Sequence, residues 1–275
     1  LDKILFQVGK LAAALVISLF NFAALIVIIA GADETFLSLK LMLAGLVCGV
    51  ITGAVTLAVI KHRSRCREEV KLELSEGYTE RFFEAAEASA SMKDLSKFIT
   101  LAVAYNLCGE WEKTLEKLDL LDESTFVMRP TGAHMYYSSK LMAYVLAGDR
   151  ENADAVYKKG FYYMNTYMNS PFYGEWVSLG LAMYEHMRGN YAESLKLLDN
   201  AAGLQKAGAK PYTRIPDENF RCVLCCWKAK NLMALGRTDG IRKMMEGCGK
   251  FYKTPFYEKM TYDIVKELNE NEAIS

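Results

Sequence analysis

The chain has 275 residues with 33 basic and 33 acidic side chains, and 52% of its residues are hydrophobic. The balanced charge excludes a chain built as a whole to bind nucleic acid or another polyanion. The length is sufficient for one or two domains with a sizeable core. The 7 cysteines are an odd number and are scattered, which is typical of a reducing compartment rather than of a disulfide-stabilised secreted protein.

The hydrophobic excess lies at the start of the chain. Residues 11–29 and 41–60 contain no charged side chain, and each run is long enough to cross a bilayer core, which takes a helix of ~20 residues. Acidic residues in the connection, and basic residues before the first run and at 61–67, predict that both termini face the cytoplasm. We therefore expect a transmembrane helical hairpin over 1–61, with spans at about 11–29 and 37–60, in an integral membrane protein.

The first run has a second interpretation. Residues 30–32, Ala-Gly-Ala, resemble a signal-peptidase site, so this span could be cleaved. The run is longer than the roughly 7–15 apolar residues of a signal peptide, which favours an uncleaved span. The chain begins at Leu1 rather than at Met, which indicates a fragment or an altered start.

Three glycines, Gly45, Gly49 and Gly53, share one face of the second run. In lipid, such a stripe of small residues lets two helices approach closely. Two interpretations stay open: the stripe packs on the first span of the same hairpin, or it contacts a membrane partner or a second copy in a homodimer.

Beyond residue 61 the apolar residues recur with helical spacing, and no segment has the alternation of a strand. Residues 62–90 predict a juxtamembrane amphipathic helix with a basic root and an acidic body. Its acidic body makes adsorption to an anionic lipid surface unfavourable. We expect this helix to cover the open side of the helical units that follow.

Prolines and glycines divide the remaining chain into similar units. Ser170-Pro171 and Thr254-Pro255 each place a hydroxyl residue before a proline and an aromatic pair, a pattern typical of a helix start. Four apolar-periodic helices each end at a glycine, and a second helix starts after a short turn. The four glycines are Gly109, Gly148, Gly189 and Gly236. This predicts four helical hairpins within 91–275, followed by a capping helix over 254–270 whose inward face holds Tyr257, Met260, Ile264, Val265 and Leu268.

Residues at fixed distances from these glycines carry a family resemblance. They are Leu101, Ala102, Tyr105, Trp111 and Leu118 in the first unit, Leu141, Tyr144, Ala153 and Tyr157 in the second, Leu181, Ala182, Tyr191 and Leu198 in the third, and Ala229, Leu232 and Met245 in the fourth. With the glycines, they resemble the tetratricopeptide repeat (TPR). The units are longer than the usual ~34 residues, and Thr114 and Ile241 replace the usual alanine. The resemblance implies an all-α fold, a TPR-like α-solenoid of about four helical hairpins after the transmembrane hairpin.

The resemblance also implies that the first helix of each unit lines a concave face. Here that face is apolar and rich in methionine, a composition that adapts to varied apolar ligands. We expect a protein or peptide partner, for example an amphipathic helix, to bind there. The residues assigned to this predicted inner face are Asn106, Met142, Trp176, Met183, His186 and Lys230. The alternative is that the same residues pack internally and bind no ligand.

The sequence predicts no catalytic residues and no cofactor, since it contains neither a nucleophile elbow nor a zinc-protease motif. Cys222, Cys225 and Cys226 share a helical face, where packing is favoured. They are weak metal candidates only because Cys248 could approach them. Three functions follow in order of preference: a membrane-anchored, cytoplasm-facing adaptor or scaffold, a structural or assembly protein acting through its hairpin, and a metal- or redox-sensing domain.

Overall fold

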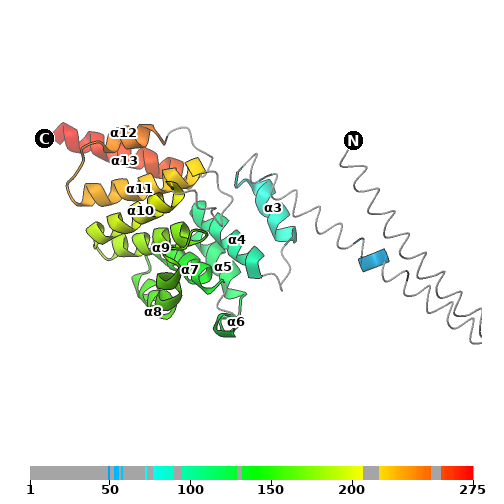
Figure 1. The fold of residues 1–275 in the computed structure, drawn as a ribbon. Coiled ribbons are helices and arrows are strands. Elements are labelled where there is room, and N and C mark those ends of the chain that lie inside the picture. The colour runs from blue at the N-terminus through cyan, green and yellow to red at the C-terminus, as the bar shows by residue number, and fades with distance from the viewer. Residues whose placement is uncertain are drawn as a thin grey trace, which may run out of the picture. The chain divides into compact units, whose positions relative to one another are not determined.

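The computed structural model describes residues 49, 53–55, 57, 72, 77–89, 95–128, 132–206, 217–248 and 255–274. The chain divides into two compact units, Leu1–Arg67 and Glu68–Ser275. No residue in the described ranges lies in a strand, so the prediction of an all-α chain is confirmed for them. The helices of the second unit (Figure 1) are α3 (Glu80–Ser89), α4 (Leu95–Leu107), α5 (Trp111–Asp119), α6 (Ser124–Met128), α7 (Ala133–Ala147), α8 (Arg150–Tyr167), α9 (Gly174–Met187), α10 (Tyr191–Lys206), α11 (Asp217–Ala234), α12 (Ile241–Glu246) and α13 (Pro255–Ile274).

The prediction of a two-span integral membrane protein is overturned by the described helices. Within the described ranges, none combines the length and the apolar character that crossing a bilayer requires. The longest of them, α13, has 20 residues but carries charged side chains along one side. The two proposed spans, 11–29 and 37–60, lie outside the described residues apart from 49, 53–55 and 57.

Two of the three glycines of the proposed stripe are described. Gly49 and Gly53 are helical, and no described atom lies within 4 Å of the position that a Cβ would take at either residue. Gly45 lies outside the described residues. The close helix packing predicted for this stripe therefore stays a prediction.

The second unit repeats one local structure four times. Each of the pairs α4/α5, α7/α8, α9/α10 and α11/α12 turns at a glycine, and these four glycines have φ of 75°, 73°, 84° and 67°. The amide of Gly109 donates to the carbonyl of Asn106, and the next amide, of Glu110, donates to Tyr105; the other three turns repeat both bonds. This is the Schellman arrangement, which needs a left-handed residue and so favours glycine.

Residues at equal distances from the four turns occupy equivalent places in the core. In the first helices these are Ala102, Leu141, Ala182 and Ala229, and in the second helices Thr114, Ala153, Ser194 and Ile241, all fully buried. The Thr114 hydroxyl donates to the Ala102 carbonyl at 3.2 Å, and the Ser194 hydroxyl to the Ala182 carbonyl at 2.6 Å. A hydroxyl residue in the alanine position is therefore satisfied by the paired helix, as a buried polar group must be. The prediction of a helical-repeat array is confirmed.

Successive pairs stack on one another. Helix α7 packs on α4 and α5, α9 on α7 and α8, and α11 on α9 and α10; α13 packs on α11 and α12, as the first helix of a fifth pair would. Tyr257, Met260, Ile264 and Leu268 of α13 are buried in the shared core, and Val265 is half-buried against it. The predicted inward face of the terminal helix is thereby confirmed.

The segment before the repeats differs from its prediction. A continuous helix was expected over 62–90, but Gly77 has a φ of 73° and residues 77–79 are not helical. The backbone amide of Phe82 donates to the Thr79 hydroxyl at 3.4 Å, so a new helix, α3, starts here. Helix α3 covers α4, with Phe82 and Ala86 buried and Phe83 stacked on Tyr105.

The two Pro-Phe-Tyr segments behave differently. Helix α13 starts at Pro255 as predicted, but residues 171–173 form a turn and α9 starts only at Gly174. A Cβ at Gly174 would lie 2.6 Å from the Met168 carbonyl and 2.7 Å from Leu204, so the chain is tightly enclosed at this point. The side chain of Phe172 is 55% exposed and therefore contributes little to the packing of α9.

The start of α13 reaches the first repeat. A Cβ at Gly109, in the turn between α4 and α5, would lie 2.6 Å from Cγ of Phe256. The next residue, Tyr257, is buried, and its hydroxyl accepts a hydrogen bond from Trp227 of α11 at 3.3 Å. The two ends of the repeat array therefore meet through the first turn of α13.

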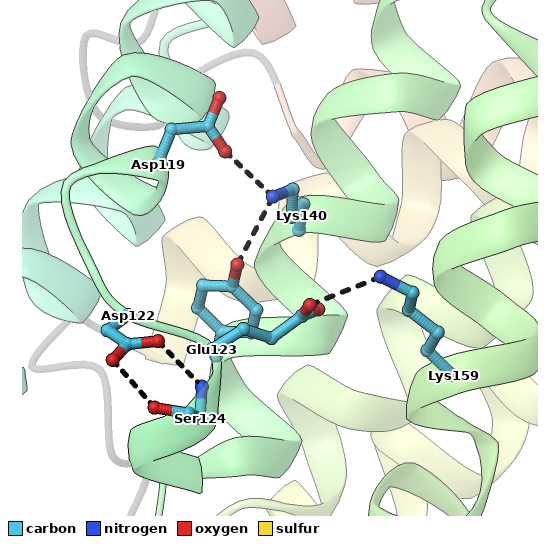
Figure 2. Close-up of polar contacts among 7 residues, drawn as sticks. Asp119, Asp122, Glu123, Ser124, Lys140 and Lys159 are labelled. Atoms are coloured by element: carbon cyan, nitrogen blue, oxygen red, sulfur yellow. Dashed lines mark hydrogen bonds and ion pairs between the residues drawn. The ribbon is translucent and has the colours of Figure 1, made fainter.

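A polar network joins the first pair to the second (Figure 2). The Lys140 ammonium of α7 contacts Asp119 at 2.7 Å and the Tyr136 hydroxyl at 3.1 Å, and Lys159 of α8 pairs with Glu123 at 3.1 Å. Between these elements, Asp122 accepts hydrogen bonds from both the amide and the hydroxyl of Ser124 and so starts the short helix α6. The ion pairs are partly exposed, and such pairs contribute only ~0–1 kcal/mol each, so they orient α6 more than they stabilise it.

Candidate functional site

Most of the predicted inner face is core. Asn106 and Met142 are 0% exposed, Met183 is 0% exposed and Trp176 is 1% exposed. His186 and Lys230 are half-buried. Four of these residues lie in two clusters: Asn106 and Trp176 contact Ser139, and His186 and Lys230 contact Trp227.

The first cluster joins α4, α7 and α9. The Asn106 amide donates to the Ser139 carbonyl at 2.8 Å, and the Trp176 indole donates to the Ser139 hydroxyl at 3.2 Å. The side-chain oxygen of Asn106, Oδ1, is buried and has no hydrogen-bond partner within the described residues. Ser139, which the sequence reasoning missed, therefore holds the first helices of three successive units together.

The second cluster joins α9, α11 and α13. His186 contacts the Asn231 side chain through Nδ1 at 2.9 Å, and its ring meets the Trp227 ring edge-on at 5.4 Å. The Lys230 ammonium lies 5.2 Å from the centre of the Trp227 ring, a cation–π geometry. Burial lowers the pKa of His186 below its usual value, so the ring is favoured in its neutral form.

The expectation that Met142, Trp176 and Met183 are partly exposed is wrong. The physical reason is that neighbouring first helices pack directly on one another and α13 reaches the first turn. These side chains therefore stabilise the array, and the surface available to a partner lies elsewhere.

An aromatic cluster lies beside these core residues. His134 of α7 stacks on Tyr167 of α8, with centroids 4.1 Å apart, and lies 4.4 Å from the ring of Tyr173. Neither ring nitrogen of His134 has a hydrogen-bond partner in the described part of the chain. Burial lowers the pKa of His134 to about 4, so it is neutral at physiological pH and acts as a packing aromatic.

The exposed large apolar side chains include three aromatics from α8 and from the turn that precedes α9. They are Phe161 (47% exposed), Tyr162 (73%) and Phe172 (55%), and we call them the aromatic patch. Ring contacts connect two of them to α7: Phe172 adjoins Tyr173, which contacts His134, and Tyr162 adjoins Tyr163, which stacks on Tyr137. Phe161 instead contacts Tyr157, which stacks on Tyr184 of α9. Large exposed aromatics that gather in this way mark interaction surfaces more often than scattered ones do.

The sequence contained a signal for this patch. The buried face of α8 is set by Ala153, Val156, Gly160 and Met164, which recur with helical spacing. Phe161 and Tyr162 lie outside that series, so these two side chains could not both face the core. Gly160 is required because a Cβ there would lie 2.6 Å from Cγ of Tyr137.

Cys222, Cys226 and Cys248 belong to one hydrophobic core, and Cys225 packs against it. The Cys226 sulfur lies 3.3 Å from the Thr261 hydroxyl, and the Cys248 thiol donates to the Met244 carbonyl at 3.4 Å. Among the described residues, no group of three or more side chains is arranged to hold a metal ion.

Comparison of the chain with protein-family models, with curated proteins and with solved structures gives no match. The repeated helix pairs of the described residues place this chain among helical-repeat proteins.

Proposed function

We propose that this chain is a TPR-like adaptor whose repeat unit binds a protein partner through the aromatic patch. The observation that carries the proposal is the exposure of Phe161, Tyr162 and Phe172 on an array whose inner face is filled. Aromatic side chains are enriched among the residues that dominate binding energy at protein interfaces. Repeat arrays commonly act by presenting an extended surface.

The charges around the patch indicate the chemistry of the partner. Lys158 lies one helical turn before Tyr162 on α8 and is exposed. Lys159 is also exposed but is paired with Glu123. We therefore propose a partner segment that places an apolar side chain on the aromatic rings and a carboxylate near Lys158. Truncating one central aromatic of such an interface costs ~2 kcal/mol, which weakens binding about 30-fold.

The test is a binding comparison with matched variants. Tyr162→Ser and Phe172→Ser should each weaken capture of the partner from the native cell extract at least about tenfold. Tyr262→Ser is the control, because Tyr262 is 69% exposed on α13 and lies outside the patch. A photo-reactive phenylalanine derivative at position 162 should cross-link to the same partner, and one at position 262 should not. Equal capture by all three variants would contradict the proposed surface.

A further inference from the structure

The histidine of the aromatic cluster is buried in a site that suits only its neutral form. His134 of α7 is 2% exposed, and both of its ring nitrogens are buried without a hydrogen-bond partner among the described residues. Its ring stacks on Tyr167 at the end of α8 and lies 4.4 Å from Tyr173, in the connection between α8 and α9. A neutral imidazole packs here as an aromatic ring does. An imidazolium would lose its hydration without gaining a hydrogen bond.

The connection between α8 and α9 is fixed at its two ends. The Met168 carbonyl accepts hydrogen bonds from the Ser178 hydroxyl at 3.2 Å and from the Asn200 side chain at 3.3 Å. The same carbonyl lies 2.6 Å from the position that a Cβ would take at Gly174, so the two ends meet. The turn between them, 169–173, contacts α7 through the rings of Tyr173 and His134. It can therefore move away from α7 while its ends stay in place.

The groups around His134 offer no charge that would compensate a proton on its ring. Helix α8 contributes the uncharged Tyr167, and the segment leading into α9 contributes Tyr173. Burial is the cause of the low pKa of His134, and no described charged side chain, the buried Glu175 of α9 included, contributes to it. A cation–π contact with the tyrosine rings replaces only part of the hydration that an imidazolium loses.

We propose that His134 is a pH-sensitive switch for the connection between α8 and α9: a proton on its ring moves Tyr173 off the ring, opens the turn 169–173 and admits water to both ring nitrogens. The exposed Phe172 belongs to this turn, and its ring adjoins that of Tyr173. Opening the turn therefore also displaces one member of the aromatic patch, so acid should weaken binding there. That consequence rests on the proposed function, whereas the switch itself does not.

The direction and size of the effect follow from the two protonation equilibria of His134. Its pKa is about 4 in the closed form, and its usual value, which applies when water reaches the ring, is 6.5. Because the pKa is depressed in the closed form, the advantage of that form is complete above pH 6.5 and is lost as the pH falls from 6.5 towards 4. Between pH 7.5 and pH 5 the ratio of open to closed form should rise roughly 25-fold.

The test is hydrogen–deuterium exchange of the full chain at pH 7.5 and pH 5, corrected for the intrinsic pH dependence of exchange and made without a partner. Three amides report the closed turn: those of Ser170, Phe172 and Gly174, which donate to the Tyr167 carbonyl, the Ser170 hydroxyl and the Ser170 carbonyl. Their protection in the wild type should fall roughly 25-fold at pH 5. The amides of the turn at Gly148 should keep their protection, because that turn lies at the opposite end of α7 from His134.

Two variants remove the titrating group. His134→Phe keeps an aromatic ring and His134→Gln keeps a polar side chain, and neither takes up a proton in this pH range. In both, the protection of the turn 169–173 should be the same at pH 5 and pH 7.5. Wild-type protein whose turn stays protected at pH 5 would overturn the switch without any variant. Acid-induced exchange that persists in either variant would assign the effect to another group and overturn it as well.

Discussion

Replacing Tyr257 by alanine should reduce the free energy of unfolding by roughly 3–5 kcal/mol, the range for removing a buried aromatic side chain. Tyr257 is 2% exposed, and its hydroxyl accepts the hydrogen bond of the Trp227 indole. The substitution leaves a cavity where α13 meets the rest of the array, and it deprives a buried donor of its acceptor. Since domains of this kind have a total stability of ~5–15 kcal/mol, the loss is a large fraction of it.

The control lies on the same helix. Tyr262 is 69% exposed, so Tyr262→Ala should change the stability by no more than ~0.5 kcal/mol. Urea denaturation of the full chain, followed by circular dichroism, measures both variants under one condition. Similar midpoints for the two alanine variants would show that α13 is not docked through Tyr257.

The second large effect is expected from Met183→Glu. Met183 is 0% exposed in α9, so the new carboxylate would enter an apolar core without a cation to pair with it. Burial of an unpaired charge is among the few changes that cost more than ~4 kcal/mol, and the thermal transition should broaden or disappear.

Met183→Leu is the matched control for that change. It nearly conserves the side-chain volume and should cost less than ~1.5 kcal/mol. A Met183→Glu protein that melts like wild type would mean that the inner face is open to solvent, as the sequence originally suggested.

The local structure of the repeats could be predicted from the sequence because it is encoded locally. The glycine turns need a left-handed residue, and the apolar spacing of α13 alone identifies its buried face. Thr114 appeared as a departure from an alanine position, and only the structure showed that its hydroxyl, like that of Ser194, binds the carbonyl of the paired helix.

The location of a binding surface could not be predicted in the same way. An apolar stripe such as Met142, Trp176 and Met183 has the same pattern whether it lines a groove or fills a core. The contact between Phe256 and Gly109 determines which of the two applies here. It joins residues far apart in sequence, so no local sequence pattern predicts it. The break at Gly77 and the turn at 171–173 were missed because surrounding contacts, rather than helix propensity, determine where those helices start.

The claim that α13 closes the repeat array onto the first turn can be tested with two glycines. Gly109 and Gly148 have nearly the same backbone, with φ of 75° and 73°, but a Cβ at Gly109 meets the Phe256 ring and a Cβ at Gly148 meets nothing within 4 Å. Alanine at either position should cost about 1–2 kcal/mol for the left-handed backbone. Gly109→Ala should lower the free energy of unfolding by at least about 1 kcal/mol more than Gly148→Ala does, because its new methyl group also overpacks against the Phe256 ring.

The most direct measurement is therefore a double-mutant cycle by urea denaturation, with Gly109→Ala and Gly148→Ala each made in wild-type and in Phe256→Ala backgrounds. A closed array predicts that the extra cost of Gly109→Ala is present in wild type and disappears when Phe256 is alanine, while the cost of Gly148→Ala is the same in both. If the two alanine substitutions lower the free energy of unfolding equally in the wild-type background, the closed array is contradicted. The inner face would then be open to solvent.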